Sequence, residues 1–198
     1  MNQIGNCSAL QLVQFVEIDE YNRMWIVDVG RLEIFTDTPR NLCPAKIVVV
    51  DLMNGNRMER VYEFPHSIVP RDSNAIRDTQ IAFTSRYDCF AYISNINPTQ
   101  TSGLIIYDFK NNDAWTAVHP SMFVDPDKQN ITIEGTILVA PFGITGLGLS
   151  PRSTQFSTLY FSKVAGDRLY RVNTNILKNK EKLKQNPMLS HPTLKILV

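Results

Sequence analysis

The residue types that most often carry catalysis or bind metals are few in this chain and lie far apart. There are three histidines, His66, His119 and His191, and none has a second histidine or a cysteine at the close spacing typical of metal ligands. The sequence contains neither a Gly-x-Ser-x-Gly nucleophile turn nor a Gly-Lys-Ser/Thr phosphate loop. We therefore predict no metal site and no cofactor, and the sequence identifies no catalytic residue.

Two of the histidines and three aspartates are explained by structural roles. His66 and His119 each neighbour a proline in a connection between predicted strands, which favours a structural or exposed role. Asp19, Asp51 and Asp108 stand where predicted strands end. Aspartate at such positions typically accepts hydrogen bonds from turn backbone, so we interpret all three as turn caps.

Composition excludes two classes of partner. The chain has 198 residues with 20 Lys+Arg against 19 Asp+Glu, and these charges are scattered. Because nucleic-acid binding needs a basic patch, we predict no nucleic-acid partner. No apolar run approaches the roughly 18 to 20 residues that a membrane helix needs, so we predict no membrane association. Residues 1–8 are polar, and the sequence as written shows no signal peptide.

The apolar pattern predicts an all-β chain. Short runs rich in Val, Ile, Phe, Tyr and Trp alternate with turn signals, and no segment before Thr174 has sustained helical spacing. The runs recur with a period of about 60 residues and about four antiparallel strands per unit, which is typical of a β-propeller. A plain β-sandwich is the alternative. The predicted strands are 12–18, 23–27, 46–52 and 57–64, then 78–83, 89–94, 103–109 and 114–118, then 146–149, 158–162 and 167–172.

A series of motifs resembles the yellow and major royal jelly protein family of insects. It begins with VEIDEYNRMWIVDVG at 16–30 and continues through several further segments in the same order and spacing as in the family. These are CPAKIVVVDL at 43–52, CFAYIS at 89–94, GLIIYDF at 103–109, AWT at 114–116, GITGLGLSP at 143–151, TLYF at 158–161 and LYRVNT at 169–174. The resemblance runs from about residue 6 to residue 177. We therefore assign residues 1–177 to a partial propeller domain and expect an irregular or helical tail at 178–198.

The resemblance implies a secreted, extracellular protein with a six-bladed propeller and a central channel. Its members are about twice as long as this chain, which looks like about three blades of an incomplete ring. It would lack the first blade and the last two, as a fragment, a truncated gene model or a degenerate copy would. Missing blades or a partner chain would then be needed to cover the open sheet faces.

Cysteines and sequons give further expectations. The resemblance implies a disulfide between Cys7 and Cys43, with both remaining reduced as the alternative, and Cys89 is expected to be a buried strand residue. Two Asn-x-Ser/Thr sequons begin at Asn6 and Asn130. Both would accept glycans if the protein enters the secretory route.

Three positions are the ligand-binding candidates that the resemblance implies. Asn74 stands before the first strand of the second unit, where the family usually has Asn followed by Asp, and here Ala75 follows it. Phe142 and Thr145 replace the acid and the aromatic ring of the family's Asp-Gly-Ile-Phe-Gly segment. In members that bind small amines, an acid or amide would pair with the ammonium group and a ring would stack on the ligand. Simple packing or turn formation is the alternative for all three.

Three classes of function follow from the resemblance. The first, which we favour, is a non-enzymatic yellow-like protein whose channel binds a small aromatic or amine ligand in a pigmentation, salivary or nutritional role. The second is an enzyme, a dopachrome-converting isomerase or tautomerase of melanin formation, which would need a positioned acid or base that no motif identifies. The third is an inactive, truncated family member.

Overall fold

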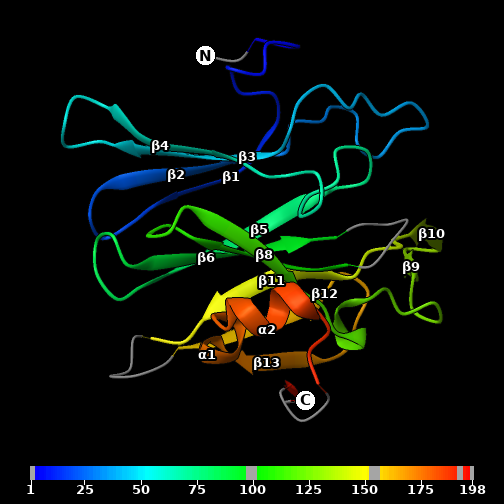
Figure 1. Ribbon diagram of the computed structural model, residues 1–198. Coiled ribbons are helices and arrows are strands. Elements are labelled where there is room, and N and C mark those ends of the chain that lie inside the picture. The colour runs from blue at the N-terminus through cyan, green and yellow to red at the C-terminus, as the bar shows by residue number, and fades with distance from the viewer. Residues whose placement is uncertain (1–2, 97–101, 152–156, 191–193, 197–198) are drawn as a thin grey trace. The chain divides into compact units, whose positions relative to one another are not determined.

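The computed structural model describes residues 3–96, 102–151, 157–190 and 194–196 (Figure 1). Over these ranges the strands form three four-stranded sheets and one two-stranded hairpin, and the helices are short. The all-β prediction is therefore confirmed. The chain consists of two compact units, Met1–Ile76 and Arg77–Val198. In the described ranges no helix is both long enough and apolar enough to cross a membrane.

The first unit holds one antiparallel sheet in which spatial order follows chain order. Its strands are β1 (Val13–Ile18), β2 (Arg23–Asp28), β3 (Lys46–Asp51) and β4 (Arg57–Glu63). The central strands β2 and β3 are almost entirely buried, whereas β1 and β4 are partly exposed. The predicted Asn-Gly turn lies between β3 and β4, where Gly55 and Asn56 have φ of 63° and 58°. Glycine and asparagine are the residues that tolerate this left-handed backbone best.

The second unit holds two more sheets of the same order. The first consists of β5 (Ile76–Phe83), β6 (Cys89–Asn95), β7 (Gly103–Asp108) and β8 (Asp113–Ala117). The second consists of β11 (Ile144–Leu149), β12 (Thr158–Lys163), β13 (Leu169–Asn173) and β14 (Leu194–Ile196).

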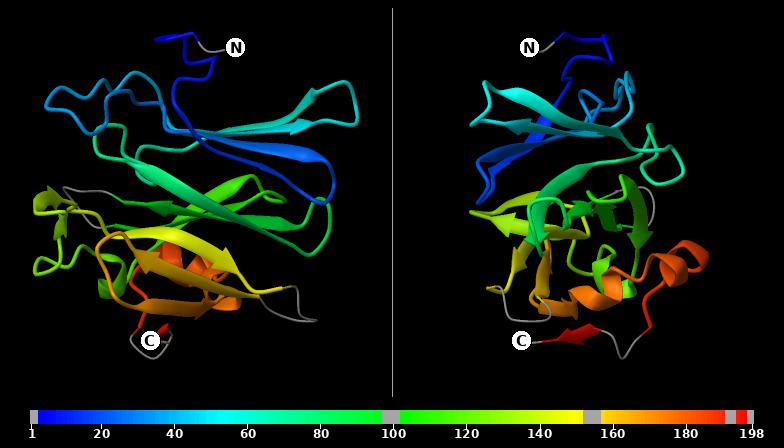
Figure 2. Two further views of the ribbon diagram at one scale, coloured as in Figure 1. Left: turned by 180° about the vertical axis from the view of Figure 1, so that it is seen from behind. Right: turned by 60° about the vertical axis from the view of Figure 1, so that its left-hand side comes forward.

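One apolar cluster joins these two sheets. Two short helices, α1 (Thr174–Leu177) and α2 (Lys180–Gln185), lie against β13 and β8, respectively (Figure 2). They contribute Leu177 and Leu183 to this cluster. Its largest member is Trp115, which is 1% exposed. Burial of apolar side chains at about 25 cal/mol per Å² makes such a cluster the main source of stability for the unit. The other buried members are Tyr92, Leu104, Ile106, Ala117, Met122, Ile144, Leu159, Phe161, Tyr170, Val172 and Leu189.

The repeated meander identifies the architecture. In each sheet neighbouring strands in space are also neighbours along the chain, whereas most β-sandwiches use Greek-key connections. A four-stranded meander repeated along a chain is the blade of a β-propeller. The predicted fold class, an incomplete propeller with about three blades, is therefore confirmed, and none of the described sheets closes on itself.

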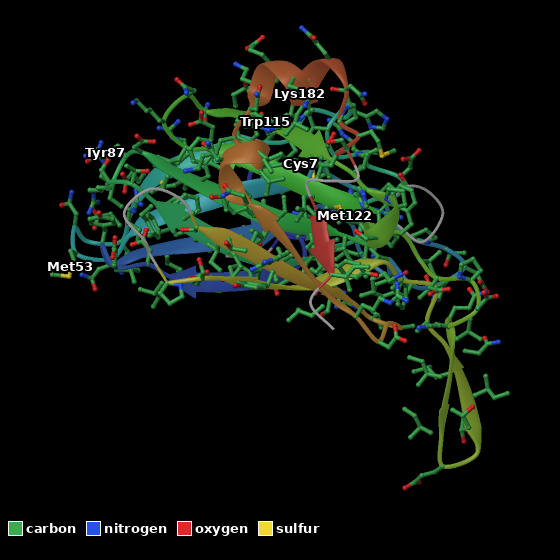
Figure 3. The ribbon with its side chains drawn as sticks, turned by 90° about the horizontal axis from the view of Figure 1, so that it is seen from below. Cys7, Met53, Tyr87, Trp115, Met122 and Lys182 are labelled. Carbon is green, nitrogen blue, oxygen red and sulfur yellow. A yellow bond between two sulfur atoms is a disulfide. The ribbon has the colours of Figure 1, made fainter. Side chains whose placement is uncertain are left out.

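The structure also contains strands that the sequence analysis did not predict. A hairpin of β9 (Asn130–Ile133) and β10 (Thr136–Val139) projects from the second unit (Figure 3). Glu134 and Gly135 form its two-residue loop with φ of 48° and 80°, the positive values of a tight hairpin turn. Strand β14 follows the two helices and pairs with β13, so part of segment 178–198 belongs to the third sheet.

Candidate functional site

Asn74 lies at the end of the connection between β4 and β5 and is completely buried. Its side-chain Nδ2 donates a hydrogen bond of 2.7 Å to the Pro70 carbonyl oxygen. Its backbone carbonyl accepts a hydrogen bond from Nη1 of Arg31. The side-chain oxygen Oδ1 is buried without a hydrogen-bond partner in the part of the chain that the structure describes. The Asn74 side chain therefore has one acceptor that is unpaired among the described residues.

Two further polar groups adjoin Asn74. Arg31 is 4% exposed, and its Nε donates a hydrogen bond of 2.7 Å to Oδ1 of Asn41. Burial lowers the pKa of Arg31 from its ordinary value, and the negative charge of Asp72 partly opposes this. The hydroxyl of Ser73 is also buried without a partner among the described residues. We call Arg31, Ser73 and Asn74 the Asn74 site.

The groups of the Asn74 site are able to form hydrogen bonds with a partner that reaches them. An amide oxygen accepts hydrogen bonds, and a hydroxyl can donate or accept one. Leaving a buried acceptor unpaired costs about 1–3 kcal/mol, which a ligand donor would recover. The Arg31 guanidinium stays charged and disfavours a second cation nearby. A neutral N–H or O–H donor is therefore the group that this site suits best.

Phe142 and Thr145 belong to the second unit, whereas Asn74 belongs to the first. Phe142 is half-buried just before β11, and its backbone N–H donates a hydrogen bond of 2.8 Å to the Ala140 carbonyl. Thr145 lies within β11, also half-buried, and its backbone carbonyl accepts a hydrogen bond of 2.9 Å from Oγ of Ser94. The structure thus places Thr145 beside strand β6 through its backbone. The ligand-binding role of Asn74, Phe142 and Thr145 stays a prediction.

Two residues near Thr145 were not singled out from the sequence. The buried Ser94 hydroxyl accepts a hydrogen bond of 2.9 Å from the Asp78 backbone N–H. Asp78 Oδ2 in turn accepts a hydrogen bond of 2.7 Å from the Leu147 N–H. These contacts connect β5, β6 and β11. The available signal in the sequence is that Ser94 is a polar residue directly after the apolar run at 89–93.

Both inter-strand histidines have structural contacts, as predicted. His119 Nδ1 accepts a hydrogen bond of 3.1 Å from the Ser121 N–H at the start of a short 3₁₀ helix, Pro120–Met122. His66 Nδ1 accepts one of 3.2 Å from the Arg71 N–H. Each ring therefore stabilises the connection in which it lies.

Two of the three predicted turn caps have simple contacts. Asp51 Oδ1 accepts a hydrogen bond of 3.0 Å from the Met53 N–H. Asp108 accepts hydrogen bonds of 3.1 and 2.7 Å from the backbone and side-chain nitrogens of Asn111. Both interpretations are confirmed.

Asp19 caps its turn as predicted and also has an ionic role. Its Oδ1 accepts hydrogen bonds of 2.8 and 3.0 Å from the N–H groups of Tyr21 and Arg23. Its Oδ2 accepts bonds of 2.8 Å from Arg23 Nε and of 2.8 Å from Trp25 Nε1. Burial alone would raise the pKa of Asp19, but the hydrogen bonds from Trp25 and Arg23 and the Arg23 charge outweigh it and lower the pKa.

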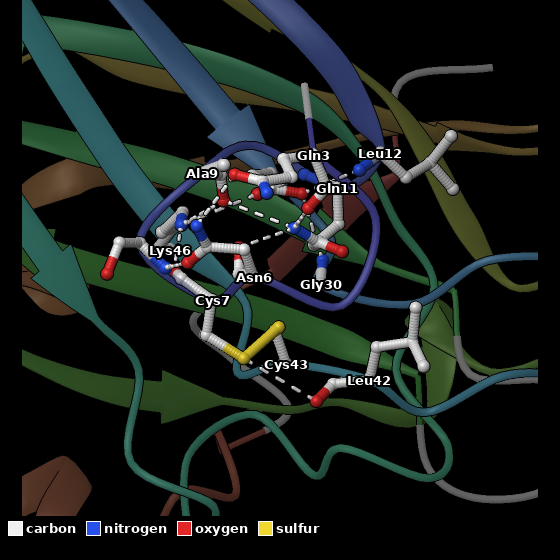
Figure 4. Close-up of polar contacts among 12 residues, drawn as sticks. Gln3, Asn6, Cys7, Ala9, Gln11, Leu12, Gly30, Leu42, Cys43 and Lys46 are labelled. Carbon is white, nitrogen blue, oxygen red and sulfur yellow. Dashed lines mark hydrogen bonds and ion pairs between the residues drawn. A yellow bond between two sulfur atoms is a disulfide. The ribbon is translucent and has the colours of Figure 1, made fainter. Parts of the chain in front are cut away.

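Cys7 and Cys43 form a disulfide, with their Cα atoms 5.3 Å apart (Figure 4). The predicted pair is therefore confirmed, and Cys89 is a free, buried cysteine as expected. Lys46, only 2% exposed, adds a second attachment, because its Nζ donates hydrogen bonds of 2.6 Å to the carbonyls of both Cys7 and Ala9. The segment before β1 is thus fixed to the first sheet by covalent and polar contacts.

Asp28 completes this attachment at the end of β2. The buried carboxylate accepts hydrogen bonds of 2.9, 2.8 and 3.1 Å from the N–H groups of Gln11, Leu12 and Gly30. Lys46 Nζ lies 3.9 Å from Asp28 Oδ2. In the described ranges no group of three or more His, Cys, Asp or Glu side chains is placed to hold a metal ion.

The successive four-stranded meanders place the chain in the β-propeller class. The family model for Major royal jelly protein matches residues 11–195, and the chain therefore belongs to the major royal jelly protein family. Similar proteins include Protein yellow of Drosophila melanogaster and of Drosophila guanche. The first is 31% identical over 183 residues, covering 90% of this chain and 33% of the relative. The second is 31% identical over 182 residues, covering 90% and 31%. The chain thus spans about a third of the length of these curated relatives.

Proposed function

We propose that this chain is part of a secreted, non-enzymatic, yellow-like protein that binds a small aromatic or amine ligand in a pigmentation, salivary or nutritional role. The observation that carries the binding proposal is the buried, unpaired Oδ1 of Asn74. Membership of the family supports the choice of ligand class and of secretion. The disulfide between Cys7 and Cys43 supports secretion independently, because such bonds persist in oxidising compartments.

The charge at the Asn74 site selects between the two ligand classes. The Arg31 guanidinium bonds to the Asn74 carbonyl, so a ligand donor reaching Asn74 Oδ1 approaches a fixed positive charge. An ammonium group would be repelled there, whereas a phenolic hydroxyl would not. The aromatic hydroxyl end of a ligand is therefore the part that we assign to Asn74.

Calorimetric titration with three probes tests this assignment. Catechol has the hydroxyl groups alone, phenethylamine has the ammonium group alone, and dopamine has both. We expect catechol and dopamine to bind and phenethylamine to bind at least tenfold more weakly, a difference of about 1.4 kcal/mol. Equal binding of phenethylamine, or no binding of any probe, would contradict the proposal.

Variants of Asn74 locate the contact. Asn74→Leu keeps a similar shape but removes the acceptor, and should weaken catechol binding at least tenfold, about 1.4 kcal/mol. Asn74→Asp keeps an acceptor oxygen and should retain binding. Asn54→Leu, in the exposed turn between β3 and β4, is the matched control. The thermal midpoint of each unliganded variant separates loss of the ligand contact from loss of folding.

We also propose that further blades or a partner chain cover the open sheet faces. The support is the exposed apolar side chains of β1, where Val16 and Ile18 are 53% and 59% exposed. Exposed apolar residues at such a level typically meet another surface. The mass of the endogenous protein tests this: a mass near that of this chain, 22.5 kDa, without any associated chain would contradict it.

A dopachrome-converting enzyme and an inactive family member remain predictions of the sequence. A tautomerase needs an acid or base positioned at its substrate. The described contacts commit His66 and His119 to turn backbone and Asp19 to a buried ion pair. Among the contacts described for residues 3–96, 102–151, 157–190 and 194–196, none favours the enzymatic alternative over ligand binding.

A further inference from the structure

The two sequons of the chain differ in how the fold holds the acceptor asparagine. N-glycosylation attaches a sugar to the asparagine side-chain nitrogen, so a transferase must reach both that amide and the hydroxyl two residues later. A sequon whose amide is already hydrogen-bonded and whose backbone is fixed must break those contacts to be used. The contacts at Asn6 and Asn130 can therefore be compared directly.

Asn6 is held at both ends of its side-chain amide. Its Nδ2 donates a hydrogen bond of 2.8 Å to Gln3 Oε1, and its Oδ1 accepts one of 3.0 Å from the Ser8 N–H. The middle residue of the sequon, Cys7, is covalently joined to Cys43. Lys46 adds a hydrogen bond to the Cys7 carbonyl (Figure 4). The Asn6 sequon is thus held by local hydrogen bonds and is attached to the first sheet by the disulfide and Lys46.

Asn130 differs from Asn6 in its contacts and not in its exposure, because Asn6 and Ser8 are exposed as well. It opens strand β9 of the hairpin that projects in Figure 3. Both Asn130 and Thr132 are exposed. Neither side chain makes a hydrogen bond to any residue that the structure describes. Residues two apart in a strand point to the same face, so the amide and the hydroxyl of this sequon lie together on one open face.

We propose that Asn130 is the N-glycosylated asparagine of this chain and that the Cys7–Cys43 disulfide keeps Asn6 unmodified. Asn130 Nδ2 attacks C1 of the first sugar of a lipid-diphosphate-linked oligosaccharide. The new bond joins N to C1, the bond from C1 to the phosphate oxygen breaks, the lipid diphosphate leaves, and the amide loses one proton to the transferase. The inference rests on the secretion part of the proposed function and not on its ligand.

The strand register shows which side chains a glycan on Asn130 would cover. Asn130 pairs with Val139 and Thr132 pairs with Ile137, so these four side chains share one face of the hairpin. Ile137 and Val139 are 65% and 59% exposed. A glycan on Asn130 therefore covers apolar side chains that would otherwise be open to aggregation through a projecting hairpin.

Glycopeptide mass spectrometry tests the site. The full-length protein that contains this chain is produced in insect cells behind a generic secretion leader, and its peptides are treated with peptide N-glycosidase in heavy-oxygen water. We expect a labelled aspartate at position 130 in most molecules and an unlabelled Asn6. An unmodified Asn130 or a modified Asn6 on secreted protein overturns the inference. Because the leader supplies entry to the secretory route, secretion of the endogenous protein is measured separately.

Separate variants test whether the Cys7–Cys43 disulfide keeps Asn6 unmodified. Cys43→Ala leaves the sequon at Asn6 intact but frees Cys7, and a measurable fraction of Asn6 should become glycosylated. Cys89→Ala removes the free cysteine of β6 and should leave Asn6 unmodified. Occupancy is read on the cell-retained fraction as well, so a folding defect does not hide the result. Unchanged occupancy of Asn6 in Cys43→Ala overturns the role of the disulfide.

A matched pair at Thr132 tests the covering role. Thr132→Ser keeps the sequon, whereas Thr132→Ala removes it with an equally small change at an exposed position. We expect only Thr132→Ala to lose the glycan and to show a several-fold larger aggregated fraction by size-exclusion chromatography with light scattering. Adding Ile137→Thr and Val139→Thr to Thr132→Ala should restore the monomeric fraction. Equal aggregation of the Ser and Ala variants overturns the covering role.

Discussion

The two units each bury one tryptophan, and they satisfy its indole N–H in different ways. In the first unit Trp25 donates to the Asp19 carboxylate at 2.8 Å. In the second unit Trp115 donates to the backbone carbonyl of Leu177 at 2.9 Å. The side chains are 0% and 1% exposed, so burial is equal and only the partner differs.

The surroundings of the two tryptophans also differ, because Trp25 lies among charged groups and Trp115 among apolar ones. Trp25 lies beside a fully buried Arg23, whose guanidinium carbon is 5.4 Å from the Trp25 ring and whose Nη1 is 3.7 Å from Glu59 Oε1. Trp115 lies in an apolar cluster with Phe90 at its edge, 6.3 Å between ring centres. A blade can thus be organised around a charged network or around apolar packing. The first arrangement depends on a titrating group and the second does not.

The largest expected effect is on the charged network. Asp19→Asn removes the countercharge of a buried arginine, which typically costs about 3–5 kcal/mol. Urea unfolding followed by fluorine NMR of fluorotryptophan measures this, because the two tryptophans report on one unit each. The Trp25 signal should lose its folded position at lower urea, while Asp37→Asn, at an exposed position in the same unit, should change nothing. A loss below about 1 kcal/mol would show that Glu59 alone balances Arg23.

A smaller effect is expected at the second tryptophan. Trp115→Phe leaves the buried Leu177 carbonyl unpaired, a cost of about 1–3 kcal/mol. The remaining signal, from Trp25, cannot report on the second unit. Near-ultraviolet circular dichroism of the tyrosine side chains follows the unfolding instead, because five of the seven tyrosines lie in the second unit. Phe90→Leu, which alters only the edge contact with Trp115, is the control and should cost less. Equal losses for the two variants would mean that packing and not the hydrogen bond holds Leu177.

The smallest expected effect is a loss of folding stability at acidic pH. Because the pKa of Asp19 is lower in the folded protein than in the unfolded chain, its contribution is complete above its ordinary value of 3.8 and is lost as pH falls through the folded value. The pKa of Asp113 in the second unit is also lowered, since hydrogen bonds from Lys180 and Lys184 outweigh burial, but this carboxylate is partly exposed. Between neutral pH and pH 3, stability of the first unit should fall more in the wild type than in Asp19→Asn. Parallel stability curves would contradict the assigned role.

Local patterns in the sequence were sufficient for most strands and turns. Alternation and apolar runs located the strands from β1 to β8 because short local stretches decide strand formation. The Asn54-Gly55 turn and the cap at Asp19 were also predictable, since each depends on neighbouring backbone. The hairpin β9–β10 also has a local signal, because Glu134-Gly135 stands between alternating Thr and Ile residues.

Contacts between distant parts of the chain were not predictable in the same way. Nothing local in the sequence shows that Asn74 is fully buried, that its Oδ1 lacks a partner, or that Asp78 bonds to Leu147. The disulfide was predicted only from the family resemblance, because cysteine spacing alone does not define pairing. Such features depend on contacts between residues far apart in the sequence, so they become visible only in the folded structure.

The position of β14 has a consequence for the newly made chain. β13 ends at Asn173, but the strand that pairs with its free edge begins only at Leu194. At a synthesis rate of about 5–20 residues per second, residues 174–193 take roughly 1 to 4 s to be added. During this interval α1 and α2 can form from local contacts, while the edge of β13 remains open to pairing with another chain. The edge of β13 therefore stays open to intermolecular pairing until residues 194–196 have been made and have left the ribosome.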